Sequence, residues 1–424
     1  MQVDFTSFKA GLNTIYLSRF DYYIETMKKI IFISLIATLA SCQEVKETNS
    51  SVKDILLDIN INQELRLSEI ADSVEVIPLE QTDESNIAMV ERIISYKNKY
   101  YVMSSITFSN GQVLIFDEQG NFIQKLDKRG GGPGEYADLQ DIAIDSRNDE
   151  LIFMTQPQGI FKYDLEGNFL SKVKGGYGMN VAVDSEGNYY KTNSCYPESP
   201  DRLLMVNEDD SIPFGRIEAD YFVMVNHYSF ANEFDSHNGR VYYSYPQCDT
   251  IYDVTGGKFL PVWYINYNGK NLPIDKIFAK NRAMEESEEI KAGYPDYFRT
   301  DAFRVTDDFL YVGSVDGAKH GVISLYSFKT GKVLSGHRLI DDLFFPENKY
   351  TFKPFRMPKA VEGNSLLWLV EPKWLLNGYE YYKKNLSPEK WAEYCKRHPQ
   401  MTEACSKLDE ESNPVLLKIK IKDF

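Results

Sequence analysis

Cysteine and histidine are scarce in this chain, and each occurs five times among 424 residues. No two cysteines form a C-x-x-C pair, and no H-E-x-x-H motif is present. A zinc ribbon, a thioredoxin-type redox site and a metalloprotease site are therefore not supported. The serine-nucleophile pattern G-x-S-x-G and a phosphate-binding loop are also missing. The sequence thus predicts no catalytic residue, no metal ligand and no bound cofactor.

Positive charge is also in short supply. The chain has 47 Lys and Arg against 62 Asp and Glu, a formal net charge of -15, and no basic block offsets it. Nucleic-acid binding depends on a positive surface that displaces counterions from phosphates. We therefore expect no nucleic-acid partner, and we interpret the acidic balance as a source of solubility.

The apolar run at 30–40 has eleven residues, too few to span a bilayer but typical of a signal peptide. Lys28 and Lys29 precede it, and Leu39-Ala40-Ser41-Cys42 fits the lipobox of bacterial lipoproteins. We predict a lipoprotein signal peptide at 27–41 and a lipid on Cys42 that makes the bacterial outer membrane a partner. The alternative is a buried apolar helix with an incidental cysteine.

Residues 1–26 do not fit this scheme, because Met27 begins the signal peptide better than Met1 does. We interpret 1–26 as an extension from a misassigned start codon. A long n-region is the alternative, which the acidic Asp4, Asp21 and Glu25 disfavour. Residues 42–70 begin with a polar stretch and are predicted to be a tether, with the folded domain at 71–424.

Aromatic residues are plentiful, with 29 Tyr and 25 Phe, and they favour strands. Residues 116–122 and 163–169 are near copies of a hairpin turn, 47 residues apart. Four strands per unit at a period of about 40–50 residues is the signature of a β-propeller. The sequence therefore predicts an all-β fold, a six-bladed propeller, with seven blades as the alternative. The third strands are predicted at 112–116, 159–163, 202–206, 250–253, 322–328 and 415–421.

The two ends of the domain are predicted to meet. The last unit lacks a fourth strand after residue 421, whereas an unassigned strand at 74–79 precedes the first unit. Pro78 suits an outermost strand, because proline cannot donate to a ladder. We expect 74–79 to pair with 415–421 and close the ring.

Two insertions, at 270–300 and 374–412, interrupt the repeat. Residues 274–290 favour a helix, and Ser387-Pro388 is a typical helix start. Both insertions are expected at one face of the ring, where their aromatics could wall a shared cleft. The alternative is that these aromatics pack the insertions onto the ring. The candidate ligand-binding residues are Trp374, Tyr379, Tyr382, Tyr294 and Tyr297.

Removal of Cys42 from the count leaves an even number of cysteines, which an oxidising compartment could pair. Cys395 and Cys405 lie in one insertion and could close a small loop, so they are the first candidate disulfide. A bond from Cys195 to Cys248 is the second, weaker candidate.

Three segments, 71–80, 129–136 and 413–418, resemble the six-bladed β-propeller lipoproteins common in Bacteroidota. The glycine-rich string at 129–136, followed by 141–145, is also similar to NHL-repeat propellers and their TolB-like relatives. The resemblance covers nearly all of the mature chain. It implies a fold and a location in the cell envelope, but it implies no enzymatic reaction. The glycine-rich string itself is interpreted as a tight connection between blades.

Three functions remain open at this point. The first is a non-enzymatic binding module on the cell envelope that captures a nutrient, glycan, peptide or protein. The second is a propeller enzyme of lyase or lactonase type with a metal in the central channel, which would need Glu, Asp, Asn or His side chains converging from several blades. The third is a structural envelope protein.

Overall fold

The computed structural model describes residues 52–105, 111–173, 176, 178–192, 201–206, 211–216, 233–245, 248–273, 293–318, 320–346 and 357–424. They belong to one compact unit, Val52–Phe424. The predictions for the signal peptide, for Cys42, for Cys195 and for the helix at 274–290 fall outside these residues.

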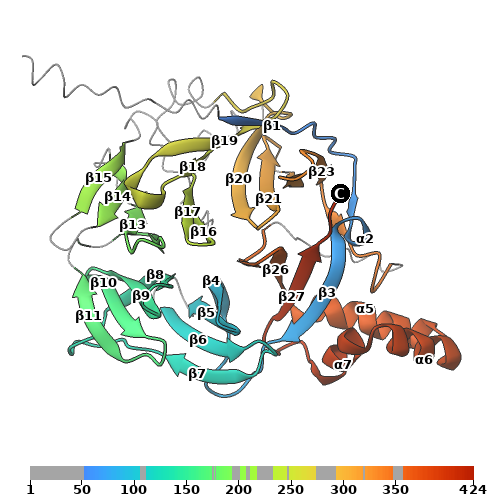
Figure 1. The fold of residues 1–424 in the computed structure, drawn as a ribbon. Coiled ribbons are helices and arrows are strands. Elements are labelled where there is room, and N and C mark those ends of the chain that lie inside the picture. Colours follow the sequence, from blue (N-terminus) through green and yellow to red (C-terminus); the bar gives the residue numbers. More distant parts are fainter. Residues whose placement is uncertain are drawn as a thin grey trace, which may run out of the picture. The chain divides into compact units, whose positions relative to one another are not determined.

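Six antiparallel blades follow one another around a ring (Figure 1), as the sequence predicted. Blades 1 and 2 contain β4 (Met89–Tyr96), β5 (Lys99–Ser105), β6 (Gly111–Asp117) and β7 (Phe122–Leu126), then β8 (Asp138–Asp145), β9 (Glu150–Gln156), β10 (Gly159–Asp164) and β11 (Phe169–Val173). Blades 3 and 4 contain β12 (Val181–Val183), β13 (Tyr189–Thr192), β14 (Asp201–Val206) and β15 (Ser211–Arg216), then β16 (Phe234–His237), β17 (Arg240–Tyr243), β18 (Thr250–Asp253) and β19 (Leu260–Asn266). Blades 5 and 6 contain β20 (Phe298–Val305), β21 (Phe309–Asp316), β22 (Gly321–Ser327) and β23 (Val333–Gly336), then β25 (Ala360–Glu362), β26 (Ser365–Val370), β27 (Val415–Ile421) and β3 (Ala71–Pro78).

The first strand of each blade contacts the first strand of the next, from β4 through β8, β12, β16, β20 and β25 back to β4. These strands therefore line the axis of the ring. The core lies between neighbouring blades: Tyr101 and Ile115 of blade 1, for example, pack in one cluster with Leu139 and Phe153 of blade 2. This burial of apolar faces between sheets is the main force that holds the blades together.

The ring closes as the sequence predicted. Strand β3 pairs antiparallel with β27, so that Val74 lies opposite Ile419 and Pro78 lies opposite Val415. β3 is the outermost strand of blade 6, where Pro78 leaves no ladder donor unmatched. All six predicted third strands are third in their sheets.

Residues 52–70 correct the predicted tether, because they belong to the ring. β1 (Lys53–Leu56) adds a parallel strand outside β19, and β2 (Leu65–Arg66) pairs parallel with β24 (Leu339–Ile340). A short helix, α2 (Leu67–Ile70), then leads into β3. Ile55 and Leu57 are almost fully buried in a cluster with apolar side chains of blades 4 and 5, and Leu65 is buried in a cluster with those of blades 5 and 6. We call residues 52–70 the strap, and the folded unit starts there.

The repeated turns have one geometry. In the turn after β6, one carboxylate oxygen of Asp117 accepts hydrogen bonds from the backbone N–H groups of Gln119 at 2.9 Å and Asn121 at 2.8 Å. Gly120 has a φ of 88°, a backbone angle that residues with a Cβ rarely adopt. Asp164 and Gly167 repeat this arrangement after β10. The near-identical strings in the sequence therefore encode the same third-to-fourth-strand turn.

The insertion at 374–412 forms helices between β26 and β27, namely α5 (Pro372–Asn385), α6 (Pro388–Arg397) and α7 (Pro399–Lys407). Ser387 caps α6, and its hydroxyl oxygen accepts from the Lys390 N–H at 3.4 Å. α7 contacts β3, so the insertion lies against the outer side of blade 6. No helix within the described ranges is both long and apolar enough to cross a membrane.

Candidate functional site

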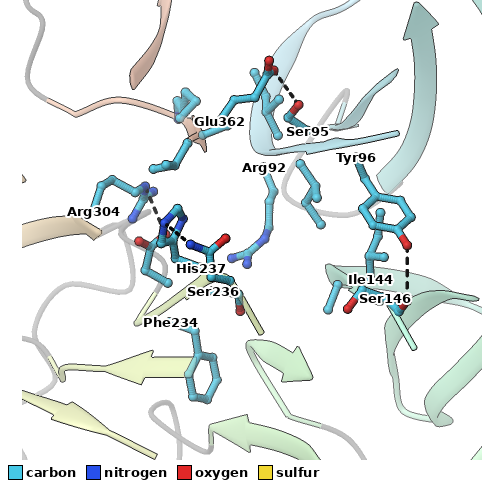
Figure 2. A pocket seen from close by; sticks show the side chains of 18 of the residues that line it. Arg92, Ser95, Tyr96, Ile144, Ser146, Phe234, Ser236, His237, Arg304 and Glu362 are labelled. Carbon is cyan, nitrogen blue, oxygen red and sulfur yellow. Dashed lines mark hydrogen bonds and ion pairs between the residues drawn. The ribbon is translucent and has the colours of Figure 1, made fainter. Parts of the chain in front are cut away.

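A cavity of about 410 Å³ occupies the centre of the ring (Figure 2), and every blade contributes to its wall. Most of the wall comes from first strands and the turns that follow them. The lining residues are Glu91 to Tyr96 of blade 1, Ala143, Ile144 and Ser146 of blade 2, Val183 of blade 3, Phe234 to Gly239 of blade 4, Arg304 of blade 5, and Met357 with Lys359 to Gly363 of blade 6. The volume falls within the range of pockets that hold small molecules.

The cavity reaches the turns between first and second strands, where Ser146, Asn238 and Gly363 lie. Because antiparallel strands reverse direction, second-to-third-strand connections leave from the opposite end of each blade. Helices α5 to α7 form such a connection in blade 6. The cavity end and the helical insertion are therefore at opposite ends of that blade.

Three cations from three blades meet in the cavity wall: Arg92 on β4, Arg304 on β20 and Lys359 just before β25. Figure 2 shows the Arg92 guanidinium extending into the space between the blades, with Arg304 and His237 facing it. Burial lowers the pKa of Arg304, with a further contribution from the charge of Arg92. Burial and the charge of Arg304 also lower the pKa of Lys359. Arg304 thus repels both Arg92 and Lys359 in a poorly solvated place.

Two buried carboxylates oppose these cations and join neighbouring blades. Asp141 accepts from the Val181 N–H of blade 3 at 2.9 Å, and its other oxygen lies 3.6 Å from Nε of Arg92. Asp235 accepts from the Val305 N–H of blade 5 at 2.6 Å, and its other oxygen lies 3.8 Å from Nε of Arg304. Burial raises the pKa of both carboxyl groups, and the facing arginine works against that shift.

Polar groups near the turns are mostly engaged with one another. His237 and Asn238 both contact a carboxylate oxygen of Asp307, at 2.9 and 2.7 Å. The Ser95 hydroxyl donates to Glu362 at 2.8 Å. The hydroxyl of Tyr96 donates to Asp149 at 2.6 Å, and burial together with this bond raises the pKa of Tyr96 to about 12. These groups form a fixed polar wall rather than a set of free acids and bases.

The part of the chain that the structure describes contains no group of three or more His, Cys, Asp or Glu side chains placed to hold a metal ion. The Asp141 and Asp235 carboxylates are each committed to a backbone N–H and an arginine. A metal-dependent lyase or lactonase therefore finds no ligand set among these residues.

Comparison with known families bears on the whole ring. The model of a domain of unknown function, DUF4934, matches residues 51–420. The chain belongs to the DUF4934 family. The matched range begins where the strap begins, which agrees with a folded unit that includes residues 52–70.

The fold of the DUF4934 chain is shared with a crystal structure from Bacteroides fragilis, that of a protein predicted to be exported. The two are 16% identical with a TM-score of 0.62, over 88% of this chain and 99% of that one. A DUF4221 member from Bacteroides vulgatus is 10% identical with a TM-score of 0.45, over 84% of this chain and 98% of that one. No curated protein matches the chain significantly.

The structure places the five candidate aromatics of the DUF4934 chain in two separate groups. Tyr379 and Tyr382 are 7% and 8% exposed and pack among the helices, with Tyr382 against Phe345 and Tyr394. Trp374 is half-buried against the same cluster. This differs from the expected cleft lining, because α5 turns these rings toward its own helical core and blade 6.

Tyr294 and Tyr297 form the second group. Their rings meet edge to face at 5.2 Å, and both are half-buried just before β20. No ring contact joins them to the α5 aromatics within the described ranges. The shared aromatic cleft is therefore not formed by the residues that the structure describes, and none of the five candidates lines the central cavity.

Cys395 and Cys405 both carry free thiols, so the first candidate disulfide is not formed in this structure. Cys395 lies on α6, whereas Cys405 lies on the buried face of α7 with its sulfur 3.8 Å from that of Met401. Burial raises the pKa of the Cys405 thiol to about 12. Cys248 is a buried free thiol, and its candidate partner Cys195 lies outside the described ranges.

The sequence analysis missed the cationic cluster. A signal was present, because Glu91 and Arg92 stand between Val90 and Ile93 in an otherwise apolar stretch, and Arg304 stands between Phe303 and Val305. A charge inside a buried strand is unusual and needs a partner. Only the closed ring, however, brings three such charges from blades 1, 5 and 6 to one place.

Proposed function

We propose that this chain is a non-enzymatic ligand-binding module of the bacterial cell envelope, held at the outer membrane by a lipid on Cys42, and that it binds a small molecule in the central cavity. The observation that carries the proposal is the cavity of about 410 Å³ lined by all six blades. Such a pocket combines a rigid wall with a few placed polar groups, which is the usual construction of a small-molecule site.

The chemistry of the wall favours binding over catalysis. Its histidine, asparagine and carboxylates are hydrogen-bonded to each other or to backbone groups. The hydrogen bonds of Asp235, His237 and Asn238 to their partners are 2.6–2.9 Å long. A general acid or base must instead face a substrate with a pKa suited to proton transfer. The envelope address is supported by the signal-peptide pattern at 27–41 and by the similar Bacteroides fragilis protein.

Blocking the cavity tests the proposal. Ser236 lies on β16, lines the cavity and is exposed, so Ser236→Trp should fill the cavity without disturbing the core. Ser171→Trp is the matched control, because Ser171 is exposed on β11, the outer strand of blade 2. We would screen a library of monosaccharides, organic acids and dipeptides by calorimetry against the three proteins.

A compound that binds the unaltered protein and Ser171→Trp, but loses at least about tenfold in affinity with Ser236→Trp, supports the proposal. Binding that Ser236→Trp leaves unchanged would place the site elsewhere. Conversion of a bound compound, followed by nuclear magnetic resonance over hours, would contradict a non-enzymatic role.

A further inference from the structure

The cationic cluster of Arg92, Arg304 and Lys359 has more hydrogen-bond donors than the described residues use. Nε of Arg92 is buried and has no hydrogen-bond partner among them, since Asp141 lies 3.6 Å away. Nε of Arg304 lies 3.8 Å from Asp235, and Nη1 of the same guanidinium donates to the Phe303 carbonyl oxygen at 2.7 Å. A guanidinium carries five N–H donors, and burial makes unmatched ones costly.

Lys359 adds a third set of donors. Its ammonium donates to the Val90 carbonyl oxygen at 3.2 Å. An ammonium group has three N–H donors, so two remain after this bond. The side chain extends from blade 6 toward blade 1, where Arg92 lies two residues after Val90. Donors from both residues therefore surround the same part of the cavity wall.

The nearby carboxylates do not remove the need for an acceptor. Asp141 and Asp235 each give one oxygen to a backbone N–H of the next blade, and that bond fixes their position. Glu91 accepts from the Ser105 hydroxyl at 2.6 Å. These acids reduce the repulsion among the cations, but Asp141 and Asp235 are held by backbone N–H groups and Glu91 is bonded to Ser105.

The remaining wall is partly apolar. Ile94, Ile144, Val361 and Phe234 line the same cavity beside the ring of Tyr96. A ligand that fits has a charged group for the cations and a compact body with apolar faces, such as a sugar ring or a short peptide. A planar carboxylate offers two oxygens in the geometry that a guanidinium fork matches.

We propose that Arg92, Arg304 and Lys359 bind the carboxylate of a small acidic ligand in the central cavity. This inference rests on the proposed function, and it names the chemical class of the ligand. An acidic sugar and the C-terminus of a short peptide share the required group, so the experiment separates these two sources.

The experiment uses matched probes in calorimetry at pH 7. D-galacturonate is compared with D-galactose, and Ala-Ala with its C-terminal amide, so that each pair differs at the carboxylate alone. Inorganic phosphate is the third arm. Each probe is titrated into the unaltered protein, Arg92→Gln, Lys359→Gln and Ser236→Trp, and into Lys125→Gln, which loses the same charge at an exposed position on β7.

We expect the acid of one pair to bind at least about tenfold more tightly than its neutral partner, because charge-assisted hydrogen bonds discriminate by that much or more. Arg92→Gln and Lys359→Gln should each weaken that acid about tenfold or more, and Lys125→Gln should not. If Arg92→Gln strongly lowers the melting temperature, only the binding data from Lys359→Gln are used to test the proposal. The pair that responds identifies the source of the carboxylate.

If an acid and its neutral partner bind equally well, and Ser236→Trp abolishes the binding of both, the carboxylate site is overturned while the proposed function stands. Binding of phosphate without either acid would also overturn it, in favour of a phosphate ligand. Failure of both acids at millimolar concentration would overturn it as well. If Lys125→Gln weakens binding as much as Arg92→Gln does, the loss comes from the change in net charge, and the proposed carboxylate site is overturned.

Discussion

Single glycines set the turns between third and fourth strands, and one of them also sets the distance between blades. Gly120 has a φ of 88°, and a Cβ added there would overlap the carbonyl oxygen of Pro78 on the neighbouring blade. Its own carbonyl oxygen accepts from the Glu80 N–H at 2.8 Å. The residue thus serves a turn and a blade junction at once, and both requirements exclude a side chain.

Gly120→Ala is expected to lower the free energy of unfolding by about 1–3 kcal/mol, through backbone strain and the clash with blade 6. Gly131→Ala is the control, because a Cβ at Gly131 meets nothing within 4 Å. Urea denaturation followed by tryptophan fluorescence measures both. Equal stability of the two variants would refute the role of Gly120.

The roles of residues in repeated local patterns could be predicted from the sequence. The roles of residues that depend on a single long-range contact could not. The Asp-x-x-Gly-Asn strings and the Ser387 cap have local causes, so the sequence alone was sufficient for them. Arg92 and Arg304 are 212 positions apart (304 minus 92) and meet because the ring is closed. The burial of Tyr379 was missed for a similar reason: exposure depends on what α6 and α7 cover, which no local pattern records.

The strap shows the same limit at the scale of elements. β1 and β2 are short, and each pairs in parallel with a strand far along the chain, Lys53 opposite Trp263 and Leu65 opposite Leu339. Neither has a hairpin turn or a repeat to mark it. The polar stretch after Cys42 favours a tether, and only the long-range pairing shows that the apolar residues of 52–70 belong to the ring.

Leu57→Ala is expected to destabilise the protein by about 2–5 kcal/mol, because Leu57 is fully buried in the cluster between blades 4 and 5. Its neighbour Leu56 is 53% exposed, so Leu56→Ala should change the stability by less than about 0.5 kcal/mol. Thermal denaturation of the two variants makes the comparison. A strap that acts only as a tether would give two equal, small effects.

At the scale of the whole molecule, the six blades provide a rigid ring, and the proposed function places that ring beside a membrane. The strap begins with β1, which pairs outside β19 at the outer edge of blade 4. The cavity lies on the axis of the ring. The start of the strap and the cavity therefore lie at different parts of the ring.

Cys42→Ala is expected to move the protein from the membrane fraction to the soluble fraction, since alanine has no thiol to form the thioether with the lipid. Fractionation with immunoblotting measures the shift. Ser41→Ala keeps a small residue before the cysteine and serves as the control that stays in the membrane. Membrane retention of Cys42→Ala would contradict lipid anchoring.

Ring closure by β3 and β27 has a consequence for how the protein is made. Residues 71–78 are synthesised before all the other strands of the six blades, whereas their partner strand at 415–421 is synthesised after them. Until then β3 lacks its partner strand, and blade 6 keeps open edges that proteases and chaperones recognise. A chain cut anywhere before residue 415 cannot hide them. Completion of the ring therefore covers these edges, and only a chain that contains residues 415–421 can reach that state.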